Sequence, residues 1–177
     1  MILDSFVNEY RRYKSLAEKA ISQVDDAALH RALGFEGNSI AVTMNHISGN
    51  LRSRFTNFLT EDGEKSWRDR ESEFEERMES RADLLEKWNR AWEVLFAVLG
   101  DIRDSDLGRC VTIRGEELSI ADALHRSLAH TAYHVGEVVL LARVGAGETW
   151  KSLSIPRGQS EEFNRKMLRE HPPRPPG

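Results

Sequence analysis

Residues 119–144 read SIADALHRSLAHTAYHVGEVVLLARV, and this stretch determines the class of fold that we expect. Its core-facing positions recur every three or four residues, which places them on one face of a helix. That stripe is centred on Leu124, Leu128, Thr131, Val135, Val138 and Ala142. Ser119 followed by Asp122 has the spacing of an N-terminal helix cap, and Gly145 and Gly147 follow the last apolar residue. The stretch therefore predicts a long amphipathic helix.

Three further segments carry the same helical periodicity. One covers residues 2–24, one runs from residue 40 until Asp62-Gly63, and one covers residues 80–99, with Gly100 as a stop signal. Ser80 and Asp83 repeat the cap spacing seen at Ser119. A helix rises about 1.5 Å per residue, so each of the four segments would be about 30 Å long. Four amphipathic helices of matched length predict an all-α protein, a four-helix bundle.

The connections suggest smaller elements. Residues 25–37 have room for a short extra helix, and the charged residues 63–79 are long enough for a crossover. Residues 110–118, CVTIRGEEL, predict a small hairpin before the last helix. We expect residues 1–147 to form the bundle and residues 148–177 to form a C-terminal extension. The extension should pack back on the bundle through Trp150, Leu153, Ile155 and Phe163, and end in the proline-rich tail HPPRPPG.

Composition and charge exclude several classes of protein. The chain has 177 residues, 40% apolar and 31% charged, with a net charge of -4, which is an ordinary globular balance. Basic residues form no run, so we expect neither nucleic acid nor a membrane surface as a partner. Cys110 is the single cysteine, which excludes a disulfide framework and a thiolate metal cluster. The longest apolar run is interrupted by charged residues, so we expect a cytoplasmic protein.

Three histidines form the candidate metal site. His130 and His134 lie four residues apart on the last helix, about 40° apart around its axis, so both rings can face one ion. His46, in the middle of the second helical segment, is the natural third ligand. His125 points about half a turn around the helix axis away from His134, so it cannot join the same ion. The other two histidines lie in a connection and in the tail, at His30 and His171. A histidine pair at this spacing also occurs by chance on many helix surfaces, so the spacing alone leaves that alternative open.

Arg126 and Glu137 lie on the same shoulder of the last helix as the histidine pair. Polar side chains at the edge of a core need a partner, a ligand or water. One interpretation makes them catalytic residues: Arg126 would hold a substrate carboxylate, and Glu137 would take a proton or orient a ligand. The alternative is a solvated face on which Arg126–His130 and Tyr133–Glu137 are ordinary neighbours one turn apart.

The histidine motifs resemble those of the DinB-like superfamily of metalloenzymes. LAHTAYHVGE, at residues 128–137, resembles its last-helix signature His-x-x-x-His-Arg-Gly-Gln, and Met44-Asn45-His46-Ile47 resembles its second-helix histidine. Three stretches look like a subgroup described as a domain of unknown function: NHISGN at 45–50, DGEK at 62–65 and WKSLSIPRG at 150–158. The resemblance extends to Phe163. The chain departs from the signature where Val135 replaces Arg and Glu137 replaces Gln.

The resemblance implies an up-up-down-down bundle, often dimeric, with His46, His130 and His134 on one zinc or nickel ion. Some members of the superfamily use a low-molecular-weight thiol, among them a mycothiol-dependent maleylpyruvate isomerase and bacillithiol transferases. The missing arginine weakens any transfer of substrate or thiol contacts to this chain, but it does not affect the three ligands.

Two hypotheses of function follow. The first is a metal-dependent enzyme, an S-transferase or hydrolase with a small-molecule substrate, because three histidines leave a coordination position open. The second is a non-enzymatic metal- or ligand-binding bundle that acts as a dimeric sensor or structural module. A cleft at the open position, with Arg126 or Glu137 at its rim, favours the enzyme, whereas a sealed ion favours the structural role.

Overall fold

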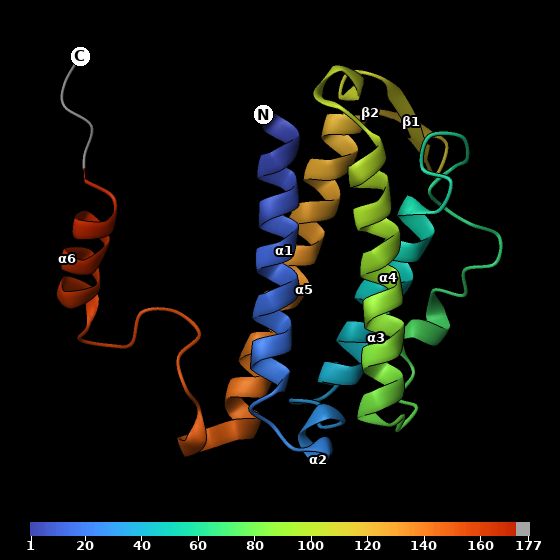
Figure 1. Ribbon diagram of the computed structural model, residues 1–177. Helices are drawn as coiled ribbons and strands as arrows, with labels where there is room; N and C mark the ends of the chain where they lie inside the picture. Colours follow the sequence, from blue (N-terminus) through green and yellow to red (C-terminus); the bar gives the residue numbers. More distant parts are fainter. Residues whose placement is uncertain (173–177) are drawn as a thin grey trace.

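Four long helices lie side by side in the structure, a computed structural model that describes residues 1–172 (Figure 1). The helices of the bundle are α1 (Ile2–Ile21), α3 (Ile40–Phe55), α4 (Arg81–Asp101) and α5 (Ile120–Ala146). The connections carry α2 (Asp26–Leu29), the strands β1 (Cys110–Ile113) and β2 (Glu116–Ser119), and three short 3₁₀ helices: η1 (Glu71–Phe74), η2 (Asp104–Asp106) and η3 (Gly147–Thr149). The last helix is α6 (Ser160–Glu170). The predicted helical bundle, extra helix and hairpin are confirmed.

Helices α1 and α5 run in one direction, and α3 and α4 run in the other (Figure 1). Asp104, just after α4, accepts hydrogen bonds from the backbone N–H groups of Ile2 (3.1 Å) and Leu3 (3.0 Å), so α4 ends where α1 begins. Gln23 accepts a bond of 2.7 Å from Lys151 N, so α1 and α5 end together. The expected up-up-down-down order is therefore wrong. Because α3 and α4 are parallel, residues 56–80 must cross the length of the bundle. They include the charged residues 63–79, for which the sequence suggested a crossover.

Serine caps begin three of the long helices. The hydroxyls of Ser39, Ser80 and Ser119 accept hydrogen bonds from the backbone N–H groups of Val42, Asp83 and Asp122. The helix ends match the sequence less closely. Helix α3 stops at Phe55, because Thr56 leaves the helical conformation and Asn57 has a φ of +49°. Helix α4 passes through Gly100 and ends at Asp101.

Aromatic and aliphatic side chains fill the space between the four helices. Trp88 and Trp92 on α4 and Tyr10 on α1 are fully buried, together with Met44 and Leu51 on α3. Burying a large side chain of this kind stabilises a fold by about 1.5–3 kcal/mol. This core fixes the rotation of α3 and α5 about their axes, and it therefore decides which of their side chains face each other.

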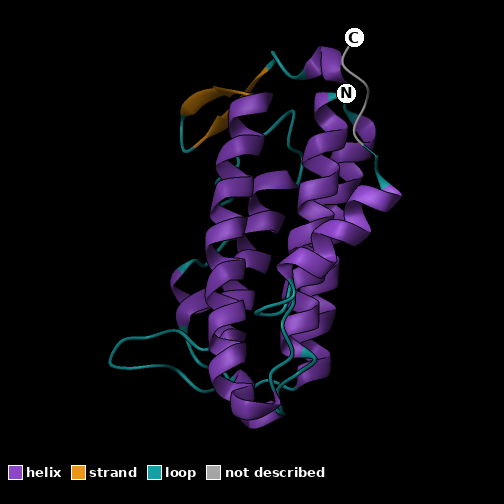
Figure 2. Cartoon of the chain, turned by 90° about the vertical axis from the view of Figure 1, so that its left-hand side faces the viewer, coloured by secondary structure: helices purple, strands orange, loops and turns teal. Residues whose placement is uncertain are grey.

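The β1–β2 hairpin lies at the end of the bundle that also holds the N-terminus (Figure 2). Its strands pair with Cys110 opposite Ser119, and its turn is Arg114-Gly115, both with positive φ. Asp62 of the crossover accepts hydrogen bonds of 2.8 Å from the N–H groups of both turn residues. The hairpin and the crossover are thus joined.

The C-terminal extension packs on the bundle only through its first residues. Trp150 and Leu153 are partly buried against the core, but Ile155 and Phe163 are 37% and 41% exposed. Helix α6 stands apart from the bundle (Figure 1). The expected packing therefore does not extend to Ile155 and Phe163. Most of the proline-rich tail, residues 173–177, lies outside the described residues. In the part of the chain that the structure describes, no helix is long and apolar enough to cross a membrane.

Candidate metal centre

His46 from α3 meets His130 and His134 from α5 in the middle of the bundle. One helical turn separates His130 from His134, so their rings lie on the same side of α5. The ring centroids of His130 and His134 are 4.6 Å apart, and those of His46 and His134 are 4.8 Å apart. One ring nitrogen from each residue lies within 4.8 Å of the other two. The structure therefore brings together the three histidines that the sequence singled out, as a cluster that can hold a metal ion.

Two carboxylates orient two of these rings. His46 Nδ1 lies 2.9 Å from Glu73 Oε2, and His134 Nδ1 lies 3.1 Å from Glu137 Oε2. An ionised carboxylate only accepts hydrogen bonds, so each neutral ring carries its proton on Nδ1. The Nε2 atoms of His46 and His134 then carry the lone pairs, and that of His46 lies 3.0 Å from His130 Nε2. A histidine whose other nitrogen donates to a carboxylate is the usual arrangement of a metal ligand.

Glu73 is itself held by a buried arginine. Arg68 Nε and an Nη atom each donate to one oxygen of Glu73, both at 2.8 Å, and the side chains of Arg68 and Glu73 are only 2% and 9% exposed. Burial alone would raise the pKa of Glu73, but its hydrogen bonds and opposite charges with Arg68 and His46 lower that pKa below its usual value. Glu73 therefore stays ionised and keeps the His46 ring in one orientation.

His130 is the ligand candidate without an orienting partner. Its Nδ1 is buried and has no hydrogen-bond partner among the described residues, while its Nε2 lies 3.0 Å from His46 Nε2. Burial lowers the pKa of His130 to about 3, and positive charge on His134 or His46 lowers it further. Burial also lowers the pKa of His134, although Glu137 opposes this. Both rings are thus kept neutral, which is the form that binds metals.

The size of the cluster suits one ion after a small movement. Two ligand nitrogens of a tetrahedral zinc ion are about 3.4 Å apart, since each Zn–N bond is about 2.1 Å. The three ring nitrogens of the cluster lie within 4.8 Å of one another. The rings would therefore have to move closer together to share one ion.

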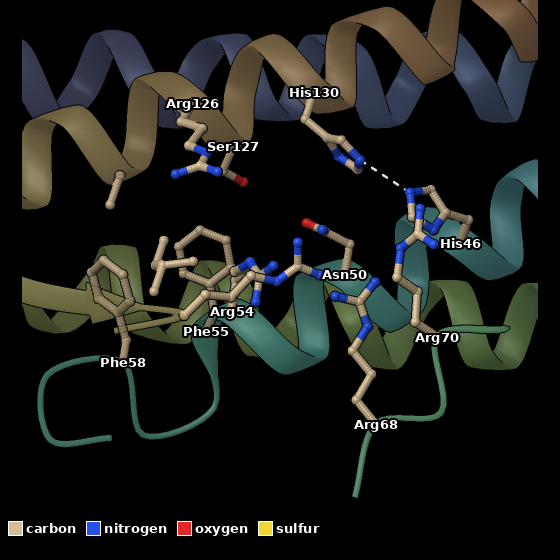
Figure 3. A pocket seen from close by; sticks show the side chains of 13 residues that line it. His46, Asn50, Arg54, Phe55, Phe58, Arg68, Arg70, Arg126, Ser127 and His130 are labelled. Atoms are coloured by element: carbon tan, nitrogen blue, oxygen red, sulfur yellow. Dashed lines mark hydrogen bonds between the residues drawn. The ribbon is translucent and has the colours of Figure 1, made fainter. Parts of the chain in front are cut away.

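A cavity adjoins the histidine cluster on the hairpin side (Figure 3). It has a volume of about 220 Å³, and His46 and His130 form part of its wall. Helix α5 contributes Arg126 and Ser127, and helix α3 contributes Asn50 and Arg54 from the opposite side (Figure 3). An ion at the three histidines would therefore have open space beside it.

Comparison with known proteins assigns the chain to a family. A family model described as "Protein of unknown function (DUF1572)" matches residues 1–159. The chain belongs to the DUF1572 family. No curated protein and no solved structure gave a match. The DUF1572 match covers the whole bundle, and with it the three histidines, their two carboxylates and the cavity. It ends just before α6.

Arg126, Glu137 and His125 lie at different distances from the histidine cluster of this DUF1572 protein. Arg126 lines the cavity, and its Nη1 donates to Glu116 Oε2 at 2.9 Å, so it pairs with the hairpin instead of with His130. Glu137 Oε2 lies 3.1 Å from His134 Nδ1, at the edge of the cluster, and its predicted catalytic role stays a prediction. His125 packs its ring against Phe6, with 4.7 Å between centroids, and takes no part in the cluster.

Two histidines expected outside the site lie outside it. The His30 ring lies 2.6 Å from Glu76 and 3.0 Å from the carbonyl oxygen of Glu79, in the loop beside α4. His171 is exposed after the end of α6.

Sequence reasoning missed Glu73 and Arg68, which lie in the crossover. Neither belongs to a recognisable motif, and 27 residues separate His46 from Glu73. The available signal was Gly49 in the stretch NHISGN. A Cβ atom at Gly49 would lie 2.1 Å from Glu73 Oε1, so only glycine leaves room there for the carboxylate in its present position.

Proposed function

We propose that this DUF1572 protein is a divalent-metal-dependent enzyme of the DinB-like superfamily, an S-transferase or hydrolase with zinc or nickel on His46, His130 and His134. One observation carries this proposal. Three histidines form a cluster beside a cavity, and carboxylates orient two of them.

The residues around the cluster support a catalytic rather than a structural site. Structural zinc sites are normally closed by four protein ligands, whereas catalytic sites have three and keep a position open. Among the described residues, only three histidines form a cluster of metal-ligating side chains here. The cavity lies beside them, with Arg126 in its wall, which is the arrangement that favours an enzyme.

The side chains divide the work of such a site. A bound divalent ion would lower the pKa of a water molecule or of a low-molecular-weight thiol, and so supply a nucleophile at neutral pH. Glu73 and Glu137 hold the His46 and His134 rings, and Glu137 is also placed to accept a proton at the edge of the cluster. Arg126 can bind a carboxylate of the substrate from the other side of the cavity.

A second candidate function is a dimeric metal or ligand sensor without catalysis. An apolar stripe on the outer face of α5 favours a homodimer. It consists of Tyr133, Leu140 and Val144, which lie on one side of the helix and are 72%, 58% and 49% exposed. The stripe says nothing about catalysis, so a dimer is compatible with both candidate functions. Turnover separates the two.

The test is a screen of the zinc-loaded and nickel-loaded protein for thiol transfer, with several low-molecular-weight thiols, and for ester hydrolysis. The enzyme proposal predicts metal-dependent turnover that is lost in His130→Ala and retained in His125→Ala, since His125 lies on the same helix outside the cluster. Tight metal binding without turnover on any substrate would favour the sensor.

A further inference from the structure

The cavity is built by two helix faces with matched spacing. On α3, Asn50 and Arg54 follow His46 at intervals of one turn, and on α5, Ala123 and Ser127 precede His130 in the same way. The small side chains of Ala123 and Ser127 leave the space that larger residues would fill. The volume of about 220 Å³ lies below the range of about 300–1,000 Å³ that is usual for ligand pockets, so the occupant must be a small molecule.

The wall of the cavity is strongly basic. None of its lining residues is acidic, and five are arginines: Arg54, Arg68, Arg70, Arg114 and Arg126. Within residues 1–172, four glutamates pair with these five arginines. Glu64 is shared by Arg54 (3.1 Å), Arg114 (2.8 Å) and, at 4.0 Å, Arg68. A guanidinium has five N–H donors, and these pairs leave most of them unused. The cavity therefore has an excess of positive charge and of hydrogen-bond donors.

The charge is concentrated around Arg54. Burial lowers the pKa of Arg54, and the positive charges of Arg68 and Arg114 lower it further, although Glu64 raises it. An anion between these side chains would relieve the repulsion among them. The opposite wall adds an unused polar group. Tyr10 OH donates to the carbonyl oxygen of Leu124, and Ser127 Oγ is buried without a hydrogen-bond partner among the described residues.

The far end of the cavity is apolar. Phe55 and Phe58 stand at the end opposite His46, with Arg54 and Asn50 between (Figure 3). The rings of Phe55 and Phe58 are 5.2 Å apart between centroids, and Ile113 of the hairpin lines the cavity beside them. The cavity thus has histidines at one end and phenylalanines at the other, with Arg54 and Asn50 between them (Figure 3).

We propose that this cavity binds a small carboxylic acid with an aromatic or other apolar end. Its carboxylate lies between Arg54 and Arg126, where Ser127 Oγ donates to it, and its apolar end lies against Phe55 and Phe58. A carboxylate suits the site better than a phosphate dianion, because glutamates already neutralise most of the arginine charge. The inference rests on the proposed function only in assigning the reacting end of the acid to the histidines.

Calorimetric titration of the full chain with benzoate tests the proposal. Benzamide has the same ring without the charge, and inorganic phosphate has the charge without the ring. We expect benzoate to bind at least about tenfold more tightly than either, since a hydrogen bond to a charged group is typically worth such a factor. Equal affinity for benzamide would overturn the anion site, and equal or tighter binding of phosphate would overturn the carboxylate and its apolar end.

Variants locate the binding. Arg126→Gln and Ser127→Ala should each weaken benzoate binding, Arg126→Gln by about tenfold. Arg143→Gln is the matched control, an exposed arginine on the same helix α5 that does not line this cavity. Arg54→Gln, with Arg52→Gln as its control on α3, repeats the test from the opposite wall. Unchanged affinity in both Arg126→Gln and Arg54→Gln would overturn the proposal.

The titrations are made both with a chelator and with zinc, because the arginines do not need the metal. Benzoate binding without any zinc binding would support the carboxylate site and contradict the metal-dependent enzyme. Zinc binding without benzoate binding would contradict the carboxylate site and leave the metal centre standing.

Discussion

Glu73 Oε2 accepts a hydrogen bond of 2.9 Å from His46 Nδ1, across 27 residues of sequence and from the crossover to α3. Through this bond, a residue that cannot reach the centre of the cluster decides which nitrogen of His46 faces it. The same bond links the metal centre to Arg68, and therefore to the cavity, of which Arg68 forms part of the wall.

Replacing Glu73 by Ala should weaken zinc binding by about 10- to 100-fold, the usual effect of removing a carboxylate that orients a ligand. The matched control is Glu71→Ala in the same short helix, because the Glu71 side chain is 88% exposed and, in the part of the chain that the structure describes, pairs only with Arg70. Calorimetric titration with zinc measures both. Equal affinities in the two variants would show that Glu73 does not orient His46.

Gly49→Ala should weaken zinc binding without unfolding the bundle. The new Cβ would lie 2.1 Å from Glu73 Oε1, so the carboxylate must move away from His46. Alanine is a better helix former than glycine, which offsets part of any loss of stability by up to about 1 kcal/mol. Gly100→Ala on α4 is the control, since its Cβ meets nothing within 4 Å. A Gly49→Ala protein with wild-type zinc affinity would contradict the role given to Glu73.

The metal-free protein should lose stability as the pH falls below about 6.5, the ordinary histidine pKa in an unfolded chain. The pKa of His130 is lowered to about 3 in the fold. Between about pH 6.5 and pH 3, this histidine is therefore protonated in the unfolded state only, which stabilises the unfolded state relative to the fold. The free energy of unfolding should fall by less than about 1.4 kcal/mol per pH unit, because the His130 ring is only partly buried.

Urea unfolding at pH 7 and pH 5, with a chelator present, measures this effect. His130→Gln should lose less stability than the wild type between the two values, whereas His125→Gln, an exposed residue on the same helix, should behave like the wild type. A His130→Gln protein with the wild-type dependence on pH would show that His130 is not the group responsible.

Truncation separates the two parts of the C-terminal extension. Removing residues 150–177 should lower the melting temperature, because Trp150 and Leu153 are packed against the core. Removing only residues 160–177 should leave it nearly unchanged, since α6 has no buried residue. Thermal unfolding followed by circular dichroism checks both, and equal melting temperatures for the two truncations would contradict this division.

The helices, caps and histidines of this protein follow from local patterns in the sequence. Ser80 with Asp83, and Ser119 with Asp122, mark helix starts through spacing alone, and the same periodicity places His130 and His134 on one face. The direction of the helices was not predictable in this way, because periodicity is the same in either direction. It depends on tertiary contacts such as that between Asp104 and Leu3.

The surroundings of the histidines also depend on tertiary structure. Arg68 and Glu73 lie in a charged crossover whose composition suggests a solvated loop, and only the path of the chain across the bundle buries them. Ile155 and Phe163 are apolar enough to suggest burial, yet the turn before α6 leads the chain away from the core. Sequence patterns identified the ligand candidates and Glu137 beside them, but not Glu73 and Arg68, which hold His46 in place.

Zinc and nickel titrations of the wild type and of single histidine variants test the metal centre most directly. The account predicts one ion per chain in the wild type, affinity at least about tenfold weaker in each of His46→Ala, His130→Ala and His134→Ala, and unchanged affinity in His125→Ala. His46→Ala is the critical variant, because its side chain comes from a different helix. Equal affinity in the wild type and in His46→Ala would contradict a three-histidine site.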